Sequence, residues 1–399
     1  MTRITTANAY AASVDNLQNR QYELSMAQQR LTSKKRVLAP SDDPAAAARA
    51  ERARAMMQRA DATQRAVDAS KNSMTLTESA LGDATELIQQ ARELTVAAGN
   101  ASYSAAQRQD VANQLTEIRK QLLSVANRGD GAGGYVFAGQ GATQPPFVDR
   151  PGGVAYVGIG GEVQVASDEA LPLTFDGDKT WLSAPSGNGV FVTSSNSANA
   201  WIDAGRVTDP SQVPADADMD YTIQFNVSGT TTTYDVMRKD GSFAVSGAPY
   251  ETGKAIEFDG MATTVSGAPV NGDTFKVTPS QPQLSAFDAL DKIIAGLKDP
   301  AKSGAEVTQT VQSGLRDLDA SAGQLQGTRS LAGEILNRID GVTGRVADLK
   351  DYAEGTRSAA EDLDMVKAIS DFQNQQTNYS AALQTYASLQ KMSMFDYIK

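Results

Sequence analysis

Two long stretches of this 399-residue chain contain no proline, and they constrain its fold more than any other feature. Proline is absent from Ala45 to Gln144 and again from Ala301 to Lys399. Because proline breaks the interior of a helix, both stretches are predicted to be helical. The segment between them, residues 145–300, is rich in Gly, Thr, Val and Asp. That composition is typical of strands joined by turns, so we expect a β-rich insertion between two helical arms.

Apolar residues recur every seven positions in both arms, which is the period of a coiled coil. The N-terminal series are Tyr10, Leu17, Leu24, Leu31 and Leu38, and then Val67, Met74, Leu81 and Ile88. The C-terminal series are Ile335, Ile339, Val342, Val346 and Leu349, and then Met365, Ile369, Phe372, Gln376, Tyr379, Leu383 and Tyr386. The inner series are well filled and are equally compatible with a helical bundle inside one chain.

The outermost series differ because polar residues interrupt them. Gln21, Gln28, Lys35 and Gln376 stand where burial of a large apolar side chain would contribute ~1.5–3 kcal/mol. Polar seam positions weaken a helix pair but specify its register, so the terminal helices are expected to stack into a larger assembly. The predicted subunit-interface residues are Leu17, Leu24, Leu31, Ile369, Phe372, Tyr379, Leu383 and Tyr386.

The middle of the chain contains a clear hairpin pattern. Tyr221, Ile223, Phe225 and Val227 alternate with polar residues and lead into the turn residues Ser228-Gly229. The predicted fold class is therefore mainly α with inserted β, in which both chain ends form a long antiparallel coiled coil or helical bundle. The predicted segments are 1–44 (polymerisation helix and turn), 45–144 and 284–357 (helical rod), 145–283 (β-rich domain) and 358–399 (C-terminal polymerisation helix).

The composition argues against an enzyme. The chain has no histidine and no cysteine, which excludes imidazole and thiolate catalysis, the usual zinc ligands and disulfides. Gly129-x-Gly131-x-x-Gly134 follows a predicted helix instead of a strand, so we interpret it as a helix stop and turn and not as a nucleotide site. Asp216-x-Asp218-x-Asp220 lacks the later residues of a calcium loop. We predict no catalytic residues, no cofactor and no metal.

The charge and hydropathy also argue against binding to nucleic acids and against insertion into a membrane. A net charge of −11 disfavours a general nucleic-acid binder, because phosphate neutralisation needs a basic face. No run of 18 apolar residues occurs, and the start, Met1 to Leu31, lacks the apolar core of a secretory signal peptide. We therefore expect no membrane span and no cleaved signal peptide.

One segment near the N-terminus carries a family likeness. Residues 33–46 read Ser-Lys-Lys-Arg-Val-Leu-Ala-Pro-Ser-Asp-Asp-Pro-Ala-Ala, in which a basic stretch precedes the turn Pro40, Ser41, Asp42, Asp43 and Pro44. This resembles the segment that follows the first helix in bacterial flagellins and hook-associated proteins. The prolines would stop the first helix and open the second, and the two carboxylates would lie near the second helix's N-terminal dipole. The family commonly has glycine at the position of Lys34, and lysine there is expected to extend the first helix slightly.

Two further segments are similar to hook–filament junction proteins of that family. They are residues 134–147, which contain Gly-Tyr-Val-Phe-Ala-Gly and Pro-Pro-Phe, and residues 361–398. The resemblance implies a structural subunit that forms a ring between hook and filament, seats flagellin and is required for flagellum assembly and motility. The implied partners are further copies of itself, the preceding hook-associated junction protein, flagellin, an export chaperone and the type III export apparatus. The implied location is extracellular, on the flagellum.

Two alternatives remain open from the sequence. The chain could be flagellin itself, although the Pro-Pro-Phe segment and the C-terminus disfavour this. It could also be an adhesin or glycan-binding surface protein whose β domain exposes Trp181 and Trp201 as stacking residues, although isolated tryptophans more often belong to a core.

Overall fold

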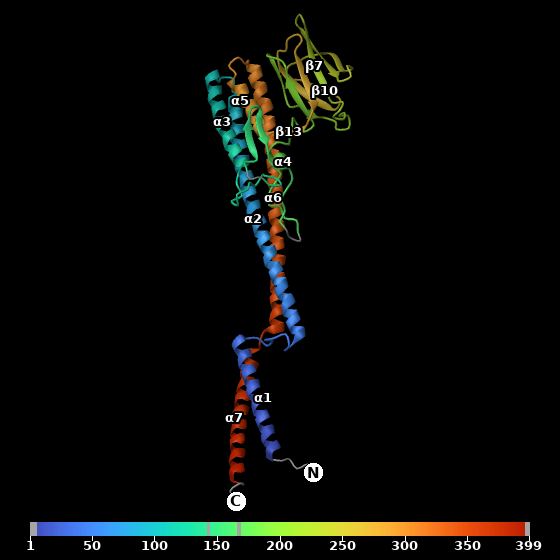
Figure 1. The fold of residues 1–399 in the computed structure, drawn as a ribbon. Helices are drawn as coiled ribbons and strands as arrows, with labels where there is room; N and C mark the ends of the chain where they lie inside the picture. The colour runs from blue at the N-terminus through green and yellow to red at the C-terminus, as the bar shows by residue number, and fades with distance from the viewer. Residues whose placement is uncertain (1–5, 142–143, 166–168, 396–399) are drawn as a thin grey trace. The chain divides into compact units, whose positions relative to one another are not determined.

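A computed structural model describes residues 6–141, 144–165 and 169–395 of the chain. Its helices are α1 (Thr6–Ser33), α2 (Pro44–Ala98), α3 (Ala105–Ala126), α4 (Gly177–Trp181), α5 (Ala286–Lys298), α6 (Gly304–Glu361) and α7 (Met365–Phe395). Strands lie only between α3 and α5 in the described residues. The predicted class, helical chain ends with an inserted antiparallel β domain, is confirmed (Figure 1). No helix in the described ranges has the length and apolar character that crossing a membrane requires.

The chain divides into two compact units. The first, called here the terminal unit, contains the residues up to Arg65 and those from Val342 onward. The second, the central unit, runs from Ala66 to Gly341. Both α2 and α6 contribute to each unit, and each unit is described by itself below.

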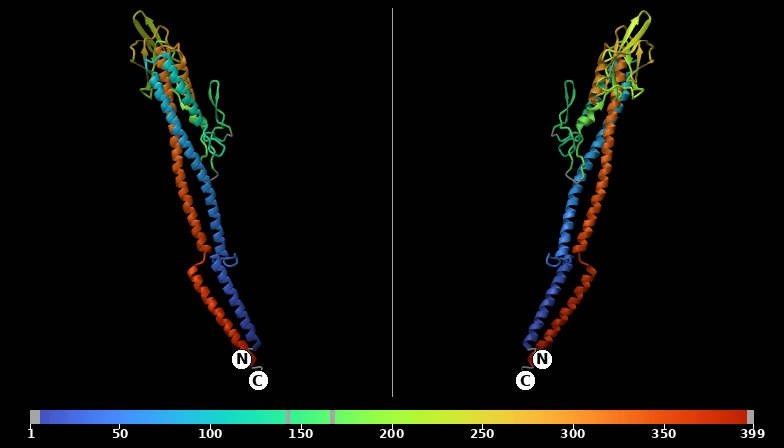
Figure 2. Two further views of the ribbon diagram at one scale, coloured as in Figure 1. Left: turned by 90° about the vertical axis from the view of Figure 1, so that its left-hand side faces the viewer. Right: turned by 90° about the vertical axis from the view of Figure 1, so that its right-hand side faces the viewer.

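In the terminal unit, α1 and α7 lie side by side and antiparallel (Figures 1 and 2). The beginning of α2 and the end of α6 are likewise paired, because Lys350 forms an ion pair with Asp61 at 2.8 Å. Of the predicted inner series, Val342 and Val346 are buried here. Leu349 continues the same spacing but is 42% exposed, whereas Ala353 and Ala360 further along α6 are buried, so the buried face continues past Leu349 through alanines.

The central unit continues the α2–α6 pair. Val67, Met74, Leu81 and Ile88 of the predicted series are all buried. Ion pairs from α2 to α6 fix the antiparallel register, and they are Lys71–Asp340 at 2.8 Å, Glu78–Arg329 at 2.7 Å and Arg92–Asp319 at 2.8 Å. The inner seams are therefore occupied within one chain, as expected for an intramolecular bundle.

A small aromatic core joins α5 to the hairpin that follows α3. The hairpin consists of β1 (Phe147–Arg150) and β2 (Gly153–Tyr156). Trp181 stacks on Phe287 of α5 with ring centroids 5.9 Å apart, and Phe147 packs against both rings. Trp181 is 1% exposed, so its interpretation as an exposed stacking residue is wrong and the core interpretation holds.

Strands after β2 form the β domain and its connections. They are β3 (Ala184–Pro185), β4 (Phe191–Ser195), β5 (Ala200–Ile202), β6 (Arg206–Val207), β7 (Tyr221–Ser228), β8 (Thr231–Arg238), β9 (Phe243–Pro249), β10 (Ala255–Phe258), β11 (Met261–Gly267), β12 (Thr274–Pro279) and β13 (Pro282–Leu284). One sheet has the order β4-β12-β7-β8-β9, and the other has the order β10-β11-β5 with β6 beside β11. β13 pairs with β3 at the entrance to the domain.

The predicted hairpin is β7–β8. Tyr221, Ile223 and Phe225 are buried on one face of β7, and Gly229 takes a positive φ of 60° in the turn. These side chains form a core with residues from β4, β5, β8, β10, β11 and β12. The domain therefore has a hydrophobic core of its own.

Candidate assembly surface

The contact between α1 and α7 begins with two tyrosines. The hydroxyls of Tyr10 and Tyr386 lie 2.5 Å apart, and their ring centroids are 5.6 Å apart. Further along, Leu17 and Tyr386 line one cavity of 330 Å³ between the two helices. The pair is therefore in contact without being tightly packed.

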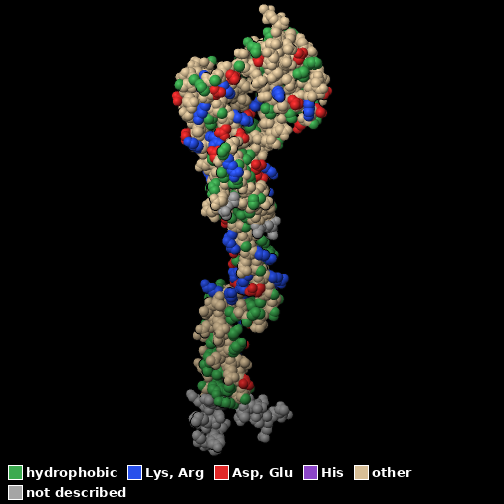
Figure 3. All heavy atoms as spheres, turned by 45° about the horizontal axis from the view of Figure 1, so that its top comes forward, with side chains coloured by type: hydrophobic (Ala, Val, Ile, Leu, Met, Phe, Trp, Pro, Cys, Tyr) green, Lys and Arg blue, Asp and Glu red, His purple; other side chains and the backbone are tan. Residues whose placement is uncertain are grey.

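Side chains of the two terminal helices are poorly buried. Among residues 10–33 and 365–388, whose side chains are described, none is buried. The predicted interface residues that are half-buried are Leu17, Leu24, Leu31, Phe372, Tyr379 and Tyr386. The other two, Ile369 and Leu383, are 46% and 40% exposed. Figure 3 shows hydrophobic side chains at the surface of this helix pair.

Because these side chains are exposed, a single subunit does not gain the free energy that burying them would contribute. Val366 and Tyr22 are 84% and 67% exposed and lie on the same two helices. Each large apolar side chain contributes ~1.5–3 kcal/mol when it is fully removed from water. Exposed apolar side chains gathered on one helix pair are typical of a surface that contacts another protein. The subunit-interface residues thus stay a prediction, and their exposure supports it.

The turn between α1 and α2 begins earlier than predicted. α1 ends at Ser33, before Pro40, and Lys34 then takes a φ of +56°. This left-handed conformation is the one that glycine favours after a helix, and the family resemblance had pointed to glycine here. Lysine therefore does not extend the helix as expected, because it adopts the helix-ending conformation itself.

The two aspartates of the turn have different roles. Asp42 Oδ2 accepts hydrogen bonds from the amides of Leu38 and Ala39 at 3.0 and 3.1 Å, which closes the loop. Asp43 Oδ1 accepts from the Ala46 amide at 2.9 Å and caps α2, whose first residue is Pro44. These backbone hydrogen bonds lower the pKa of both carboxyls, with a further contribution at Asp43 from Arg36. Of the two carboxylates that were expected near the start of the second helix, Asp43 caps it, whereas Asp42 closes the loop before it.

A buried carboxylate that the sequence analysis did not single out holds the turn against the end of α6. Glu361 is 4% exposed and forms ion pairs with Arg54 of α2, with Arg357 at 2.5 Å and with Lys35 at 3.5 Å. Burial alone would raise the pKa of Glu361, but hydrogen bonds from Arg357 and Arg54 lower it overall. Arg357 lies four residues earlier on the same helix, but Lys35 and Arg54 come from the other end of the chain, so spacing along the sequence carries no signal for those two contacts.

Backbone pairing reinforces this junction. The Arg36 amide donates to the Glu361 carbonyl at 2.7 Å, and the Leu363 amide donates to the Lys34 carbonyl at 3.0 Å. The Arg36 guanidinium also donates to the Ala360 carbonyl at 2.8 Å. The loop that leaves α1 and the linker that enters α7 are therefore bonded to each other.

Glycines 129, 131 and 134 form the turn after a helix that the sequence predicts. Asp130 Oδ1 accepts hydrogen bonds from the amides of Ala132 and Gly134, both at 2.8 Å. Gly131 has a φ of +79°, which requires glycine. The segment closes a loop after α3 and offers no strand-to-helix phosphate cradle.

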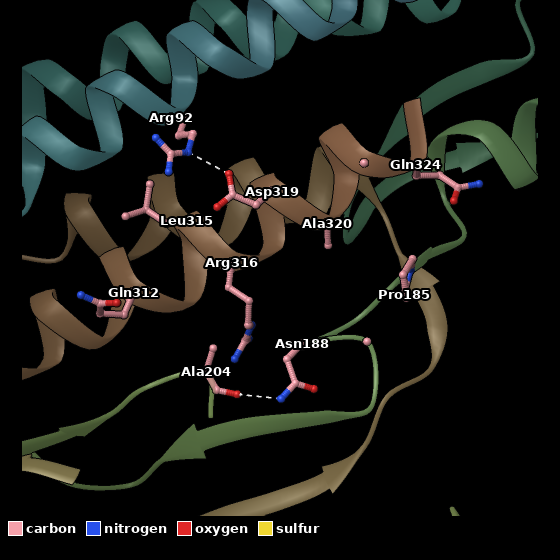
Figure 4. Close-up of a pocket in the computed structure, with 13 residues that line it drawn as sticks. Arg92, Pro185, Asn188, Ala204, Gln312, Leu315, Arg316, Asp319, Ala320 and Gln324 are labelled. Carbon is pink, nitrogen blue, oxygen red and sulfur yellow. Dashed lines mark hydrogen bonds and ion pairs between the residues drawn. The ribbon is translucent and has the colours of Figure 1, made fainter. Parts of the chain in front are cut away.

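A cavity of 690 Å³ in the central unit lies between α2, α6 and the loop before β4 (Figure 4). Its charged groups already have partners. Arg92 pairs with Asp319 at 2.8 Å, and Arg316 pairs with Asp317 at 3.0 Å. In the described residues no cluster of three potential metal ligands occurs. We assign this cavity no function.

Sequence models of two flagellar protein families match parts of the chain. A sequence model of the bacterial flagellin N-terminal helical region matches residues 4–142, and one of the D2-like domain of flagellar hook-associated protein 1 matches residues 191–279. The second match coincides with the strands from β4 to β12. A search of curated protein sequences found no match.

Several solved structures resemble the chain over nearly their full length. The flagellar junction protein FlgL from Legionella pneumophila is 26% identical with a TM-score of 0.69, and the match covers 79% of this chain and 100% of that one. FlgL from Xanthomonas campestris is 27% identical with a TM-score of 0.69, over 77% of this chain and 99% of that one. A structure of hook-associated protein 3 from Legionella pneumophila is 25% identical with a TM-score of 0.71, over 77% and 97%.

Proposed function

We infer that this chain, a flagellin-like protein of the hook-associated kind, is a structural subunit of the bacterial flagellum at the junction between hook and filament. The observation that carries this conclusion is the match to FlgL structures across almost their whole length. The D2-like domain of a hook-associated protein, at residues 191–279, favours a junction protein over flagellin.

The mechanism we propose is assembly through the terminal unit. In a ring of subunits, the exposed apolar side chains of α1 and α7 would be buried against neighbouring copies. The turn at residues 34–43 and the Glu361 ion pairs would hold both terminal helices in one orientation as they enter the ring. The β domain has its own core and does not supply any of the predicted interface residues.

The partners follow from this position. The ring would contact the preceding hook-associated junction protein on one side and the first flagellin subunits on the other. The subunit would reach the extracellular end of the flagellum through the type III export apparatus, accompanied by an export chaperone. No step in this role needs a cofactor, and we propose a structural, non-enzymatic protein.

Electron microscopy of cells labelled against the protein tests this function directly. Cells that lack the natural protein should regain motility when the chain is supplied, and label should form a single band at the end of each hook. Label along the filament would instead identify flagellin. Absence of flagellar label together with unrestored motility would overturn the proposal.

A further inference from the structure

The solvent-facing side of α2 in the terminal unit carries a second seven-residue pattern. Small and basic side chains alternate along it, and all of them are exposed: Ala48, Arg52, Ala55, Arg59 and Ala62. This spacing of four and three residues places them in one stripe on the side of α2 away from α6. We call these residues the basic stripe.

The basic side chains of the stripe form no ion pair with the described residues of the subunit. Arg52 donates only to the Ala48 carbonyl of its own helix, and neither Arg52 nor Arg59 forms an ion pair with any described residue. By contrast, Arg54, which points to the other side of α2, pairs with Glu51 and Glu361. The basic stripe therefore presents unpaired positive charge to solvent.

The solvent-facing side of α6 carries the complementary pattern. Gly344, Asp348, Asp351 and Gly355 follow the same spacing of four and three residues, and all are exposed. Neither Asp348 nor Asp351 forms an ion pair in the part of the chain that the structure describes. We call these residues the acidic stripe. Next to it, Tyr352 is 67% exposed.

The two glycines of the acidic stripe have no explanation inside the subunit. A Cβ atom added at Gly344 or Gly355 would meet nothing within 4 Å, and both glycines have ordinary helical backbones. Glycine inside a helix is unfavourable because it adds chain entropy to the unfolded state. Glycine in a helix permits the close approach of another backbone, and the space beside these two glycines is open in the subunit.

The two stripes overlap along the helix pair around Arg59 and Asp351, whereas Arg52 is level with Ala359, beyond the end of the acidic stripe at Gly355. Lys350 is paired with Asp61, so Arg59, two residues earlier on α2, is level with Tyr352 on the antiparallel α6. Asp351 is the adjacent residue. In a ring whose subunits are related by rotation about an axis along these helices, the Arg59 of one copy would therefore meet the Asp351 of the next without an axial shift.

We propose that the occupant of each stripe is a second copy of this chain, with the basic stripe of one subunit packed against the acidic stripe of its neighbour. Such a contact is head-to-tail, joins two different surfaces and closes into a ring. Alanine and glycine let the two helices approach, and the Arg59–Asp351 pair sets the register. The inference rests on the proposed ring and adds the surface through which neighbours recognise each other.

Charge reversal tests this contact. Arg59→Glu and Asp351→Arg should each prevent band formation at the hook end, because every contact in the ring acquires a like-charge pair. A single exposed pair contributes roughly two- to fivefold to pairing, and the loss multiplies around the ring. The double variant Arg59→Glu/Asp351→Arg restores opposite charges at every contact and should recover band formation and motility. Arg65→Glu is the matched control, since Arg65 is exposed on another side of the same helix.

The outcomes separate this inference from the proposed function. Both single variants should keep the thermal unfolding of the original chain, because neither side chain has an ion-pair partner within the subunit. If the unaltered chain never reaches the hook end, the proposed function fails. If the unaltered chain forms the band and Arg59→Glu does so equally well, or if the double variant fails while remaining folded, the stripe contact is wrong.

Discussion

The backbone amide of Arg36 donates a 2.7 Å hydrogen bond to the carbonyl oxygen of Glu361, and this bond joins the segment after α1 to the end of α6. The side chain of Glu361 lies beneath the same segment, where Arg54, Arg357 and Lys35 surround it. One residue thus connects both terminal helices to the helix pair that carries them.

Replacing Glu361 with glutamine should loosen this junction. The change leaves three cations without their shared carboxylate, and hydrogen bonds to charged groups contribute about 1.5 to 3 kcal/mol. We expect the amides of Arg36 and Leu363 to lose hydrogen-exchange protection, whereas amides of the β domain keep theirs. Equal protection in Glu361→Gln and the original chain would show that the backbone bonds alone hold the junction.

The junction should also weaken in acid. Since the pKa of Glu361 is lowered in the folded state, its contribution to stability is present above the ordinary value of 4.5 and is lost as the pH falls through the lower folded value. Exchange at the Arg36 amide, measured between about pH 6 and pH 3 and corrected for the intrinsic rate, should show this loss. Glu361→Gln should show a smaller change over the same range.

Lys34→Gly should stabilise the turn. A residue with a Cβ atom in the left-handed region costs about 1 to 2 kcal/mol, and glycine removes this cost at the expense of some unfolded-state entropy. The expected net gain is ~0.5–1 kcal/mol, measured by exchange at Lys35 and Arg36. Lys34→Ala keeps the Cβ atom and is the control that should show no gain. A gain of equal size in both variants would show that the loss of the lysine charge, and not the change in backbone conformation, stabilises the turn.

Asp43→Ala should fray the start of α2, whereas Asp43→Asn should not, because asparagine also caps helices. The Ala46 amide, which donates to Asp43, is the reporter. Asp42→Ala should act on a different reporter, the Leu38 amide. If the two alanine variants affected the same amides, the two carboxylates would not have the separate roles assigned to them.

The β domain should be removable. The Ser280 amide donates to the Val190 carbonyl at 2.9 Å, so the chain segments that enter and leave the domain are hydrogen-bonded to each other at this point. Replacing residues 191–279 with Asn-Gly gives a hairpin turn at this point. The shortened chain should remain folded and support motility. Deleting 147–182 instead removes Trp181 and the hairpin from the aromatic core around Phe287, and that chain should not fold.

Phe372→Ala should separate assembly from subunit stability. A fully buried phenylalanine typically contributes ~3–5 kcal/mol, but Phe372 is only half-buried in the subunit. Thermal unfolding should therefore change little, while incorporation at the hook end is lost. Phe287→Ala, at a residue that is 0% exposed, is the control that should unfold at a lower temperature. Early unfolding of Phe372→Ala would place this residue in an intramolecular core.

Much of the fold could be predicted because its signals are local. The seven-residue spacing of Val67, Met74, Leu81 and Ile88 identified a buried face correctly, since periodicity depends only on helix geometry. The same rule failed at Leu349, which is exposed although its spacing fits. The buried face continues past Leu349 through Ala353 and Ala360, so periodicity predicts which residues share a face but not which of them the partner helix covers.

The junction could not be predicted because its contacts are not local. Glu361 is buried by residues from the other end of the chain, and no spacing links Glu361 to Arg54. The prediction for Lys34 failed for a different reason. Lysine has a high intrinsic helix propensity, which favours a helical backbone over the left-handed conformation that this residue takes in the turn. In that case the tertiary contacts outweighed the local preference.

The pairing of Lys34 and Arg36 with Glu361 and Leu363 also sets an order of events in folding. It closes a loop that contains almost the whole chain, and contacts so distant in sequence form late because the intervening segments must first become compact. A chain exported as proposed above cannot form these bonds until both Arg36 and Leu363 have emerged. The paired terminal helices would thus be presented only by subunits that have been delivered in full, and a partly emerged chain would not yet carry a complete polymerising end.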